Sequence, residues 1–391
     1  MHMDHSPSRV GWLRFFGRPC LLMIILLTHA VRAQDVEMIV YVGTYTGNGS
    51  DGIYAFRFDS ATGESHVIGL AAPTKNPSFL AIDPDGRFLY AVNEVDAFEN
   101  VPTGAVTVFA IDAASGVLKP LQQVSSLGRG PAHLSLDRTA RFLMVANYGG
   151  GNVAVFPIGR DGRLGNRTAF MQGHGSSVNR ERQEAPHAHA IQVTPDNRRA
   201  IVADLGIDRL LVYGFNDKAG TLTADSARNV RVVPGSGPRH IAMTPSGSYL
   251  YLVNELTSSV TLFAFNAAEG SLQMKQTLST LPDGFEGTNT AAGIVVDAKG
   301  RFLYVSNRGD DSIVVFSIDP GSARLTLVQR IPSGGKTPRH IALDPTGGWL
   351  LSANQNSDLI SLFRVDPGNG RLTTTSHSLR VVSPVCVAFA H

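Results

Sequence analysis

The chain has 391 residues, of which 17% are charged, and its formal net charge is +2. Such a small net charge provides no global field that would favour nucleic acid or a membrane surface as a partner. The 40 glycines and 21 prolines are typical of short strands joined by tight turns rather than of helices. A chain of this length often divides into several domains, unless it consists of repeats that pack only on their neighbours.

The first 33 residues have the three parts of a signal peptide. A positive region, an apolar run and a cleavage motif follow one another as Arg9, Arg14 and Arg18, then Cys20–Leu27, then Val31-Arg32-Ala33. The apolar run is too short to span a bilayer, which takes about 20 residues. We therefore expect cleavage before Gln34 and a mature chain, 34–391, in the periplasm or outside the cell. An uncleaved anchor and a misassigned start codon are the alternatives.

Cysteine usage agrees with this interpretation. Only Cys20 and Cys386 are present, and cleavage removes the first, so the mature chain can form no internal disulfide. Valines flank Cys386, which predicts a buried structural thiol. The stability of the fold must therefore come from strand packing.

One sequence motif, the phrase of the repeat, occurs six times along the chain. Its copies are Pro77–Asn93, Pro131–Asn147, Ala188–Asp204, Pro238–Asn254, Ala291–Asn307 and Pro338–Asn354. The spacing of about 50 residues is that of propeller blades. Each copy contains a short strand, a turn such as Asp83-Pro84-Asp85-Gly86, and a nearly all-apolar strand such as Phe88–Val92, as expected when both faces of a sheet are covered. Two more strands follow each copy, so four antiparallel strands make one blade.

The two ends of the chain supply a seventh blade. Residues Pro384–Phe389 match only the first strand of the phrase, whereas Ile39–Thr44 and Gly52–Phe56 match the second and third. A blade built from both ends closes the ring and removes its open edges. No linker divides the chain, so the sequence predicts an all-β, seven-bladed propeller as a single domain over residues 34–391.

Two positions of the repeat vary while the residues around them change little. The position after the first residue of each copy holds Ser78, Ala132, His189, Arg239, Ala292 and Arg339, and the position after its last residue holds Glu94, Tyr148, Leu205, Glu255, Arg308 and Gln355. The innermost strands of a propeller line its channel, so His189, Arg239, Glu255 and Arg308 should converge at one end. Unpaired charges there would cost several kcal/mol, which predicts either a catalytic centre or a structural ion network.

The chain resembles the seven-bladed lactonase family, which includes bacterial 6-phosphogluconolactonase and the fungal enzyme that lactonises 3-carboxy-cis,cis-muconate. The segments that carry the resemblance are Tyr41–Tyr45, Val145–Phe156, Pro186–His189, Ala203–Arg209, Gly235–His240, Val253–Leu256 and Ser306–Gly309. It implies a catalytic site of one His, one Glu and two Arg, and these roles fall on His189, Arg239, Glu255 and Arg308. An exported protein would rarely meet a phosphorylated sugar, which puts the phosphate in doubt more than the lactone.

Further residues near these positions complete the predicted site. We expect His187, Glu94, Tyr148 and Arg339 to bind substrate. His187 and His189 lie two apart, so on a strand they share a face and are a candidate pair for Zn or Cu. No further His, Cys or carboxylate completes a recognisable ligand spacing nearby. We therefore expect neither a metal nor a cofactor.

Two functions from different classes fit these residues. The first is a lactonase that acts on a small-molecule sugar lactone, with Glu255 as base, Arg239 and Arg308 holding an oxyanion or carboxylate, and His189 delivering a proton. The direction, hydrolysis or cyclisation, stays open. The second is an exported platform that binds a protein or glycan without catalysis. In both cases we expect a monomer that binds neither nucleic acid nor membrane after cleavage.

Export is directly testable. The arginine-rich, apolar and Val-Arg-Ala series at the N-terminus predicts that N-terminal sequencing of the mature protein will begin near Gln34. Cytosolic protein that still begins at Met1 would contradict the prediction.

Overall fold

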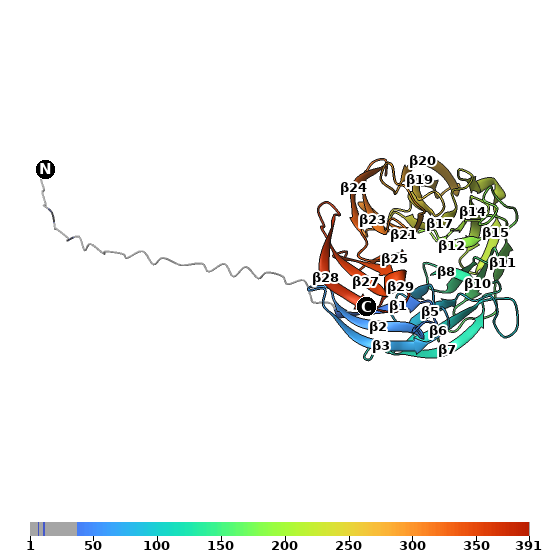
Figure 1. The fold of residues 1–391 in the computed structure, drawn as a ribbon, viewed down its shortest axis with the longest axis horizontal. Coiled ribbons are helices and arrows are strands. Elements are labelled where there is room, and N and C mark those ends of the chain that lie inside the picture. Colours follow the sequence, from blue (N-terminus) through green and yellow to red (C-terminus); the bar gives the residue numbers. More distant parts are fainter. Residues whose placement is uncertain (1–6, 8–10, 12–36, 391) are drawn as a thin grey trace, which may run out of the picture. The chain divides into compact units, whose positions relative to one another are not determined.

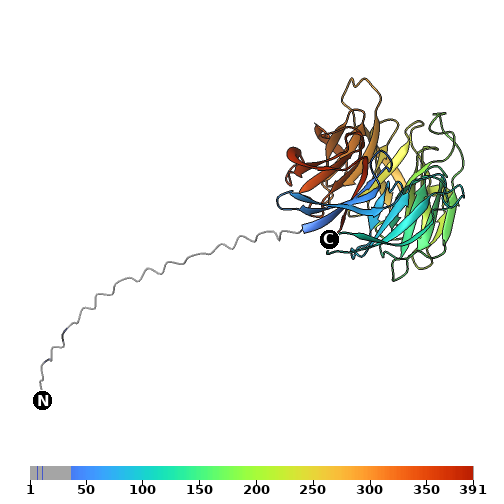
Figure 2. The same cartoon turned by 60° about the horizontal axis from the view of Figure 1, so that its bottom comes forward.

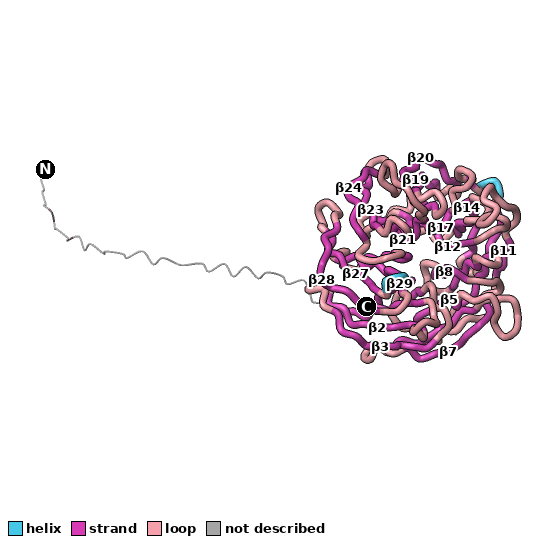
Figure 3. Tube along the Cα trace, in the orientation of Figure 1, coloured by secondary structure: helices cyan, strands magenta, loops and turns pink. Residues whose placement is uncertain are grey.

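The computed structural model describes residues 7, 11 and 37–390, so the predicted signal peptide lies almost wholly outside the described residues. Residues 37–390 form seven antiparallel sheets arranged as blades around a central axis (Figure 1). Strands dominate the ring (Figure 3), and the only helical segments in this part of the chain are the 3₁₀ turns η1 (Ser226–Arg228) and η2 (Gln355–Ser357). The predicted all-β, seven-bladed propeller is confirmed.

In every blade the strands are ordered from an innermost strand at the channel to an outermost strand at the rim. Blade 1 consists of β29 (Pro384–Ala390), β1 (Glu37–Thr44), β2 (Gly52–Asp59) and β3 (Ser65–Pro73). Blade 2 consists of β4 (Leu80–Ile82), β5 (Phe88–Asn93), β6 (Ala105–Ile111) and β7 (Leu118–Ser125). Blade 3 consists of β8 (Pro131–Leu136), β9 (Phe142–Asn147), β10 (Asn152–Pro157) and β11 (Ala169–Gln172). Blade 4 consists of β12 (Ala188–Val193), β13 (Arg199–Asp204), β14 (Arg209–Asn216) and β15 (Thr221–Ala224), with β16 (Val230–Arg231) also paired to β14.

The remaining three blades follow the same order. Blade 5 consists of β17 (Pro238–Met243), β18 (Tyr249–Asn254), β19 (Ser259–Asn266) and β20 (Ser271–Ser279). Blade 6 consists of β21 (Thr290–Val296), β22 (Phe302–Arg308), β23 (Ser312–Ile318) and β24 (Leu325–Pro332). Blade 7 consists of β25 (Pro338–Leu343), β26 (Trp349–Asn354), β27 (Leu359–Val365) and β28 (Leu372–Arg380).

The hydrophobic core is divided into seven clusters, one at each contact between neighbouring blades. Both faces of every blade are therefore buried, which explains why second strands such as β5 and β22 are apolar at almost every position. The innermost strands contact one another in sequence around the ring, and they surround the centre in Figure 1. This packing leaves the loops at the two ends of the channel as the places where function can be varied.

At five of the seven contacts between blades, a buried aromatic side chain also forms a hydrogen bond to the next blade. Aromatic side chains on second strands donate to a carbonyl in a hairpin turn of the following blade: Tyr41 to Gly116, Tyr90 to Gly162, Tyr251 to Ala323, Tyr304 to Gly370, and the Trp349 indole to Ser60. The last of these bonds joins blade 7 to blade 1, so the contact that closes the ring has the same kind of hydrogen bond.

Blade 1 joins the two ends of the described chain, as the sequence predicted. Strand β29 pairs with β1 in antiparallel register, with Val387 opposite Val42 and Phe389 opposite Val40. Figure 2 shows the blue first strand beside the C-terminal end of the chain. Cys386 is a buried free thiol in this strand, also as predicted.

Deleting the chain from Ser383 onward should open the ring. The deletion removes β29 with the buried Val385, Cys386 and Val387, and it exposes both the edge of β1 and the apolar faces of two clusters. We expect a lower melting temperature, binding of a hydrophobic dye and loss of soluble protein. A truncated protein that stayed soluble with unchanged melting would contradict closure by the two ends.

Candidate active site

The two variable positions of the repeat lie at the same end of the channel because of strand geometry. In blade 5, Pro238 pairs with Asn254 and His240 pairs with Val253, so Arg239 is the extra residue of a β-bulge. His189 in β12 and Arg339 in β25 occupy the same bulge in their own blades. A bulge redirects the side chain of its extra residue. In these three blades the repeat therefore aims one side chain away from the regular ladder.

Glu255 is the centre of the site. It follows β18, where its N–H donates to the Gly237 carbonyl (2.7 Å) and its own carbonyl accepts from the Ala291 N–H (3.2 Å). Its carboxylate is buried, and its Oε2 atom lies 3.0 Å from both Arg239 Nε and Arg308 Nη2. Two neighbouring blades thus hold one carboxylate oxygen between two guanidinium groups.

Hydrogen bonds to main-chain carbonyls fix the two arginines. Arg239, only 2% exposed, donates from Nη1 to the Ala292 carbonyl (2.7 Å), while Arg308 Nη2 lies 3.4 Å from the Ala291 carbonyl. Burial, followed by the nearby charge of Arg308, lowers the pKa of Arg239 to about 9. Arg239 is thus still cationic at neutral pH, and the Glu255 carboxylate compensates its positive charge.

The pKa of Glu255 is set by two opposing effects. Burial raises it, but Arg308, then Arg239, His189 and Arg182, lower it by more, so that it lies well below the usual range for Glu. Glu255 is therefore ionised throughout the physiological pH range. This carboxylate is a stable anion inside a buried cluster.

His189 completes the cluster as a neutral imidazole. Burial and then the charge of Arg239 lower its pKa well below the ordinary value. Its Nε2 atom is 3.8 Å from Glu255 Oε2, and its Nδ1 atom is buried without a hydrogen-bond partner among the described residues. A neutral ring in this place can accept a proton and return it. The structure thus brings together all four residues that the sequence predicted as catalytic.

The predicted substrate-binding residues fall into two groups around this cluster. On one side, the Tyr148 and His187 rings stack with centroids 4.5 Å apart. The His187 ring lies within hydrogen-bond distance of the Tyr148 carbonyl (3.0 Å) and of Glu184 Oε1 (3.1 Å). His187 therefore supports Tyr148, whose ring edge faces His189 at 5.3 Å.

The second group comes from blades 1, 2 and 7. Arg339 Nη2 donates to the Tyr45 hydroxyl (2.6 Å), which donates to Glu94 Oε2 (2.9 Å). The Arg339 guanidinium also lies 5.1 Å from the centroid of the Tyr45 ring. The sequence identified Glu94 and Arg339 but missed Tyr45. Extending the repeat alignment to the split blade would have found it, because Tyr45 follows β1 as Glu94 follows β5.

Arg182 is the other residue that sequence analysis missed. It lies in the largely polar insertion before β12, and its Nη2 atom is 2.7 Å from Glu255 Oε1 and 3.3 Å from the Tyr148 hydroxyl. The insertion is anchored on both sides of Arg182. The buried Gln183 donates to the Leu205 carbonyl (2.8 Å), and the Ser177 hydroxyl donates to Asp208 Oδ2 (2.5 Å). The segment is thus an ordered cover over the site.

Four rings fill the channel beneath the cluster. Phe79, His133, His240 and His340 come from blades 2, 3, 5 and 7, with centroids 4.3–5.7 Å apart. Burial, followed by the charge of Arg239, lowers the pKa of His133 to about 3 and that of His340 to about 4, so both rings are neutral. The repeated His position is a packing position.

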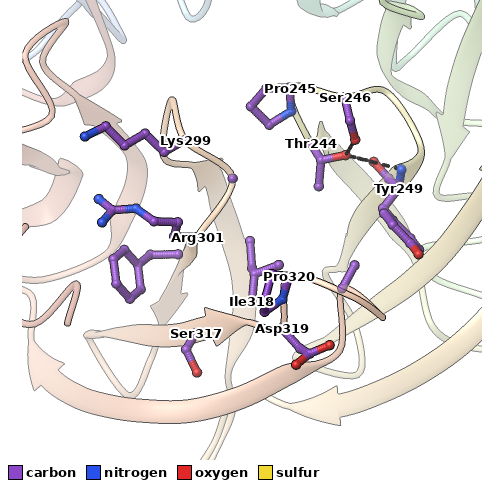
Figure 4. Close-up of a pocket in the computed structure, with 13 residues that line it drawn as sticks. Thr244, Pro245, Ser246, Tyr249, Lys299, Arg301, Ser317, Ile318, Asp319 and Pro320 are labelled. Atoms are coloured by element: carbon purple, nitrogen blue, oxygen red, sulfur yellow. Dashed lines mark hydrogen bonds between the residues drawn. The ribbon is translucent and has the colours of Figure 1, made fainter. Parts of the chain in front are cut away.

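A hollow of about 510 Å³ lies at the opposite end, between blades 5 and 6 (Figure 4). Turn residues such as Thr244, Ser246, Lys299, Arg301 and Asp319 line it. A similar hollow between blades 2 and 3 is lined by the corresponding turns. These hollows arise from the blade repeat, whereas the Glu255 cluster occurs once among the described blades.

Comparison with known proteins supports the propeller fold. The family model described as "Lactonase, 7-bladed beta-propeller" matches residues 39–389. The chain belongs to the seven-bladed β-propeller lactonase family. The lactonase chain is 37% identical to the 6-phosphogluconolactonase of Bacillus subtilis over 303 residues, which is 78% of this chain and 84% of the relative. It is 33% identical to the 6-phosphogluconolactonase of Formosa agariphila over 77% of this chain and 85% of the relative.

A solved structure resembles this lactonase as closely. The periplasmic gluconolactonase of Pseudomonas aeruginosa superposes with a TM-score of 0.85 at 37% identity, covering 91% of this chain and 99% of that one. Within the described part of the chain, no three His, Cys, Asp or Glu side chains are grouped so that they could hold a metal ion. No helix among the described residues is long and apolar enough to cross a membrane.

The buried charges predict a pH-dependent stability. A carboxylate whose pKa is lowered by folding adds stability above its unfolded pKa of about 4.3, and this contribution is lost as pH falls toward the folded value. Glu255→Gln leaves Arg239 and Arg308 without their carboxylate. It should therefore lower the free energy of unfolding at pH 7 by roughly 3–5 kcal/mol.

Denaturant unfolding of both proteins from pH 7 downward would check this. The difference between parent and variant should shrink below about pH 4, because Glu255 is then protonated in the unfolded parent but still ionised in the folded one. The matched control is Glu181→Gln, because Glu181 is exposed and should change stability little at any pH. A constant difference between parent and Glu255→Gln across the pH range would contradict the ion cluster.

Proposed function

We propose that this lactonase hydrolyses the ester bond of a sugar lactone at the Glu255 cluster. One observation carries the proposal: an ionised carboxylate lies between two fixed guanidinium groups and beside a neutral imidazole. Ester hydrolysis needs a base for water, donors for the oxyanion and a proton for the leaving alkoxide. The cluster contains a group suited to each step.

The steps can be assigned to these groups. Glu255 takes a proton from the attacking water as the new C–O bond forms, and Arg239 and Arg308 stabilise the resulting oxyanion. His189 is neutral in the free protein, so it must first gain the proton that Glu255 has taken from water, and its Nε2 atom lies 3.8 Å from the Glu255 carboxylate. The ring C–O bond then breaks, and His189 protonates the alkoxide. Cyclisation would use the same groups in reverse order.

The names of the relatives limit the choice of substrate. Two are 6-phosphogluconolactonases, and the structural neighbour is a periplasmic gluconolactonase. Together with the predicted signal peptide, these names lead us to infer that this chain acts outside the cytoplasm on a gluconolactone-like ester. A screen of plain and phosphorylated sugar lactones on purified protein tests the substrate. Failure to hydrolyse any of them, with the fold intact, would favour the binding-module alternative.

Glu255→Gln keeps the shape of the carboxylate and removes the base. We expect turnover to fall by about 10²- to 10⁴-fold. Arg308→Met should reduce turnover by a comparable factor, about 10²- to 10³-fold, through loss of oxyanion stabilisation. Lactone hydrolysis followed with a pH indicator measures both effects, and melting temperatures must be recorded with each rate.

The control for these variants is again Glu181→Gln, which should hydrolyse the lactone at the parental rate. Because Glu255→Gln also lowers stability, rates are compared at a temperature at which every variant is folded. Full activity in folded Glu255→Gln, on a lactone that the parent hydrolyses, would overturn the catalytic assignment.

A further inference from the structure

Arg182 differs from the other arginines that contact Glu255. Arg239 and Arg308 extend from the strand ends of the propeller and are buried, whereas Arg182 lies in the covering loop and its side chain is 39% exposed. It also contacts the opposite carboxylate oxygen, Oε1, and no other ion pair within the described residues reaches that atom. The Arg182 guanidinium is therefore both accessible to a ligand and in direct contact with Glu255, the proposed base.

The contact to Oε1 has a chemical consequence. Arg239 and Arg308 occupy Oε2, so Oε1 is the oxygen through which Glu255 would take a proton from water. In the free protein Arg182 covers this atom at 2.7 Å. A carboxylate whose two oxygens both face guanidinium groups is a poor base. Activity therefore requires Arg182 to leave Oε1.

The charges at the mouth indicate what would draw Arg182 away. Four guanidinium groups, those of Arg182, Arg239, Arg308 and Arg339, lie there with three carboxylates, Glu94, Glu184 and Glu255. The excess is positive, so an anion is the complementary ligand. A guanidinium binds carboxylate or phosphate through parallel N–H donors. Arg182 is the exposed member that can turn toward such a group.

We propose that Arg182 is a specificity-determining residue that binds an anionic substituent of the lactone, and that this binding moves it from Glu255 and frees Oε1 for the attacking water. The inference rests on the proposed function, because it assigns Glu255 as the base. It adds a specificity-determining residue in the loop before β12 and a reason why the base works only in the presence of substrate.

The surroundings permit this exchange. Gln183 and Ser177 anchor the loop through bonds that do not involve Arg182. Glu255 keeps both of its buried partners on Oε2. The movement is therefore confined to a side chain that is already partly in solvent, and the carboxylate stays compensated throughout.

The charged and titratable groups that face Glu255 are Arg182, Arg239, Arg308, His189, Tyr148 and Arg339. All four arginines favour the ionised carboxylate, whereas Tyr148 and His189 are neutral at pH 7. Removal of Arg182 alone therefore raises the pKa of Glu255. The acid limb of the kcat/KM profile, which reports the free enzyme, should shift to higher pH.

The test compares Arg182→Met with Arg180→Met in the full mature chain. Arg180 lies two residues away in the same loop and is exposed, so the control removes the same charge without touching Glu255. Each variant is assayed on a phosphorylated sugar lactone and on the same lactone without phosphate. Binding of inorganic phosphate is measured separately by calorimetry.

We expect Arg182→Met to raise KM for the phosphorylated lactone by roughly ten- to hundredfold, the usual loss for a charged hydrogen bond. On the plain lactone kcat should rise, because Oε1 is free in the variant whereas Arg182 still covers it in the parent. Phosphate affinity should fall in Arg182→Met and stay at the parental value in Arg180→Met. Arg182→Lys should recover part of the phosphate affinity, because it keeps the charge without the fork.

Equal KM, phosphate affinity and pH profile in Arg182→Met and Arg180→Met would overturn the role of Arg182 while leaving lactone hydrolysis intact. A parent protein that hydrolyses no lactone would instead overturn the proposed function. The phosphate measurement would still report on Arg182 in that case. The two failures are thus distinguishable.

Discussion

The structure depends on the requirement that both faces of every blade be covered. Seven core clusters meet this requirement, and the last is completed only when β29 from the C-terminal end pairs with β1. Ring closure then places seven innermost strands around one axis. Equivalent positions of distant repeats are thereby brought close to each other at the channel, which a linear chain of blades would not do.

The bulge in the first strands directs side chains from equivalent positions of the repeat toward the channel. A regular ladder would leave the side chain of Arg239 facing a neighbouring blade, but the extra residue in β17 releases it toward the channel. The same backbone device presents His189 from β12 and Arg339 from β25. The fold therefore provides the same bulge position in several blades. The side chain at that position can differ from blade to blade without disturbing the core.

This division explains what sequence analysis could and could not predict. The fold was predictable from the repeat itself. The cluster of His189, Arg239, Glu255 and Arg308 was predictable because aligning the copies shows which positions carry unusual charged residues. Arg182 was not, because it lies in an insertion that has no counterpart in the other blades, and the position of a loop depends on anchors such as Gln183 that no periodicity marks. Tyr45 was missed because its blade is split between the chain ends, so only six copies were aligned.

The mouth also has an electrostatic asymmetry. The Glu255 cluster is built by blades 4, 5 and 6, whereas the Arg339–Tyr45–Glu94 group is built by blades 7, 1 and 2. Burial lowers the pKa of Arg308, the Glu255 carboxylate raises it, and the repulsion from Arg339 lowers it further. Rigid blades cannot move apart to relieve this repulsion. An anionic ligand would relieve it, which agrees with the anionic substituent that we propose for Arg182.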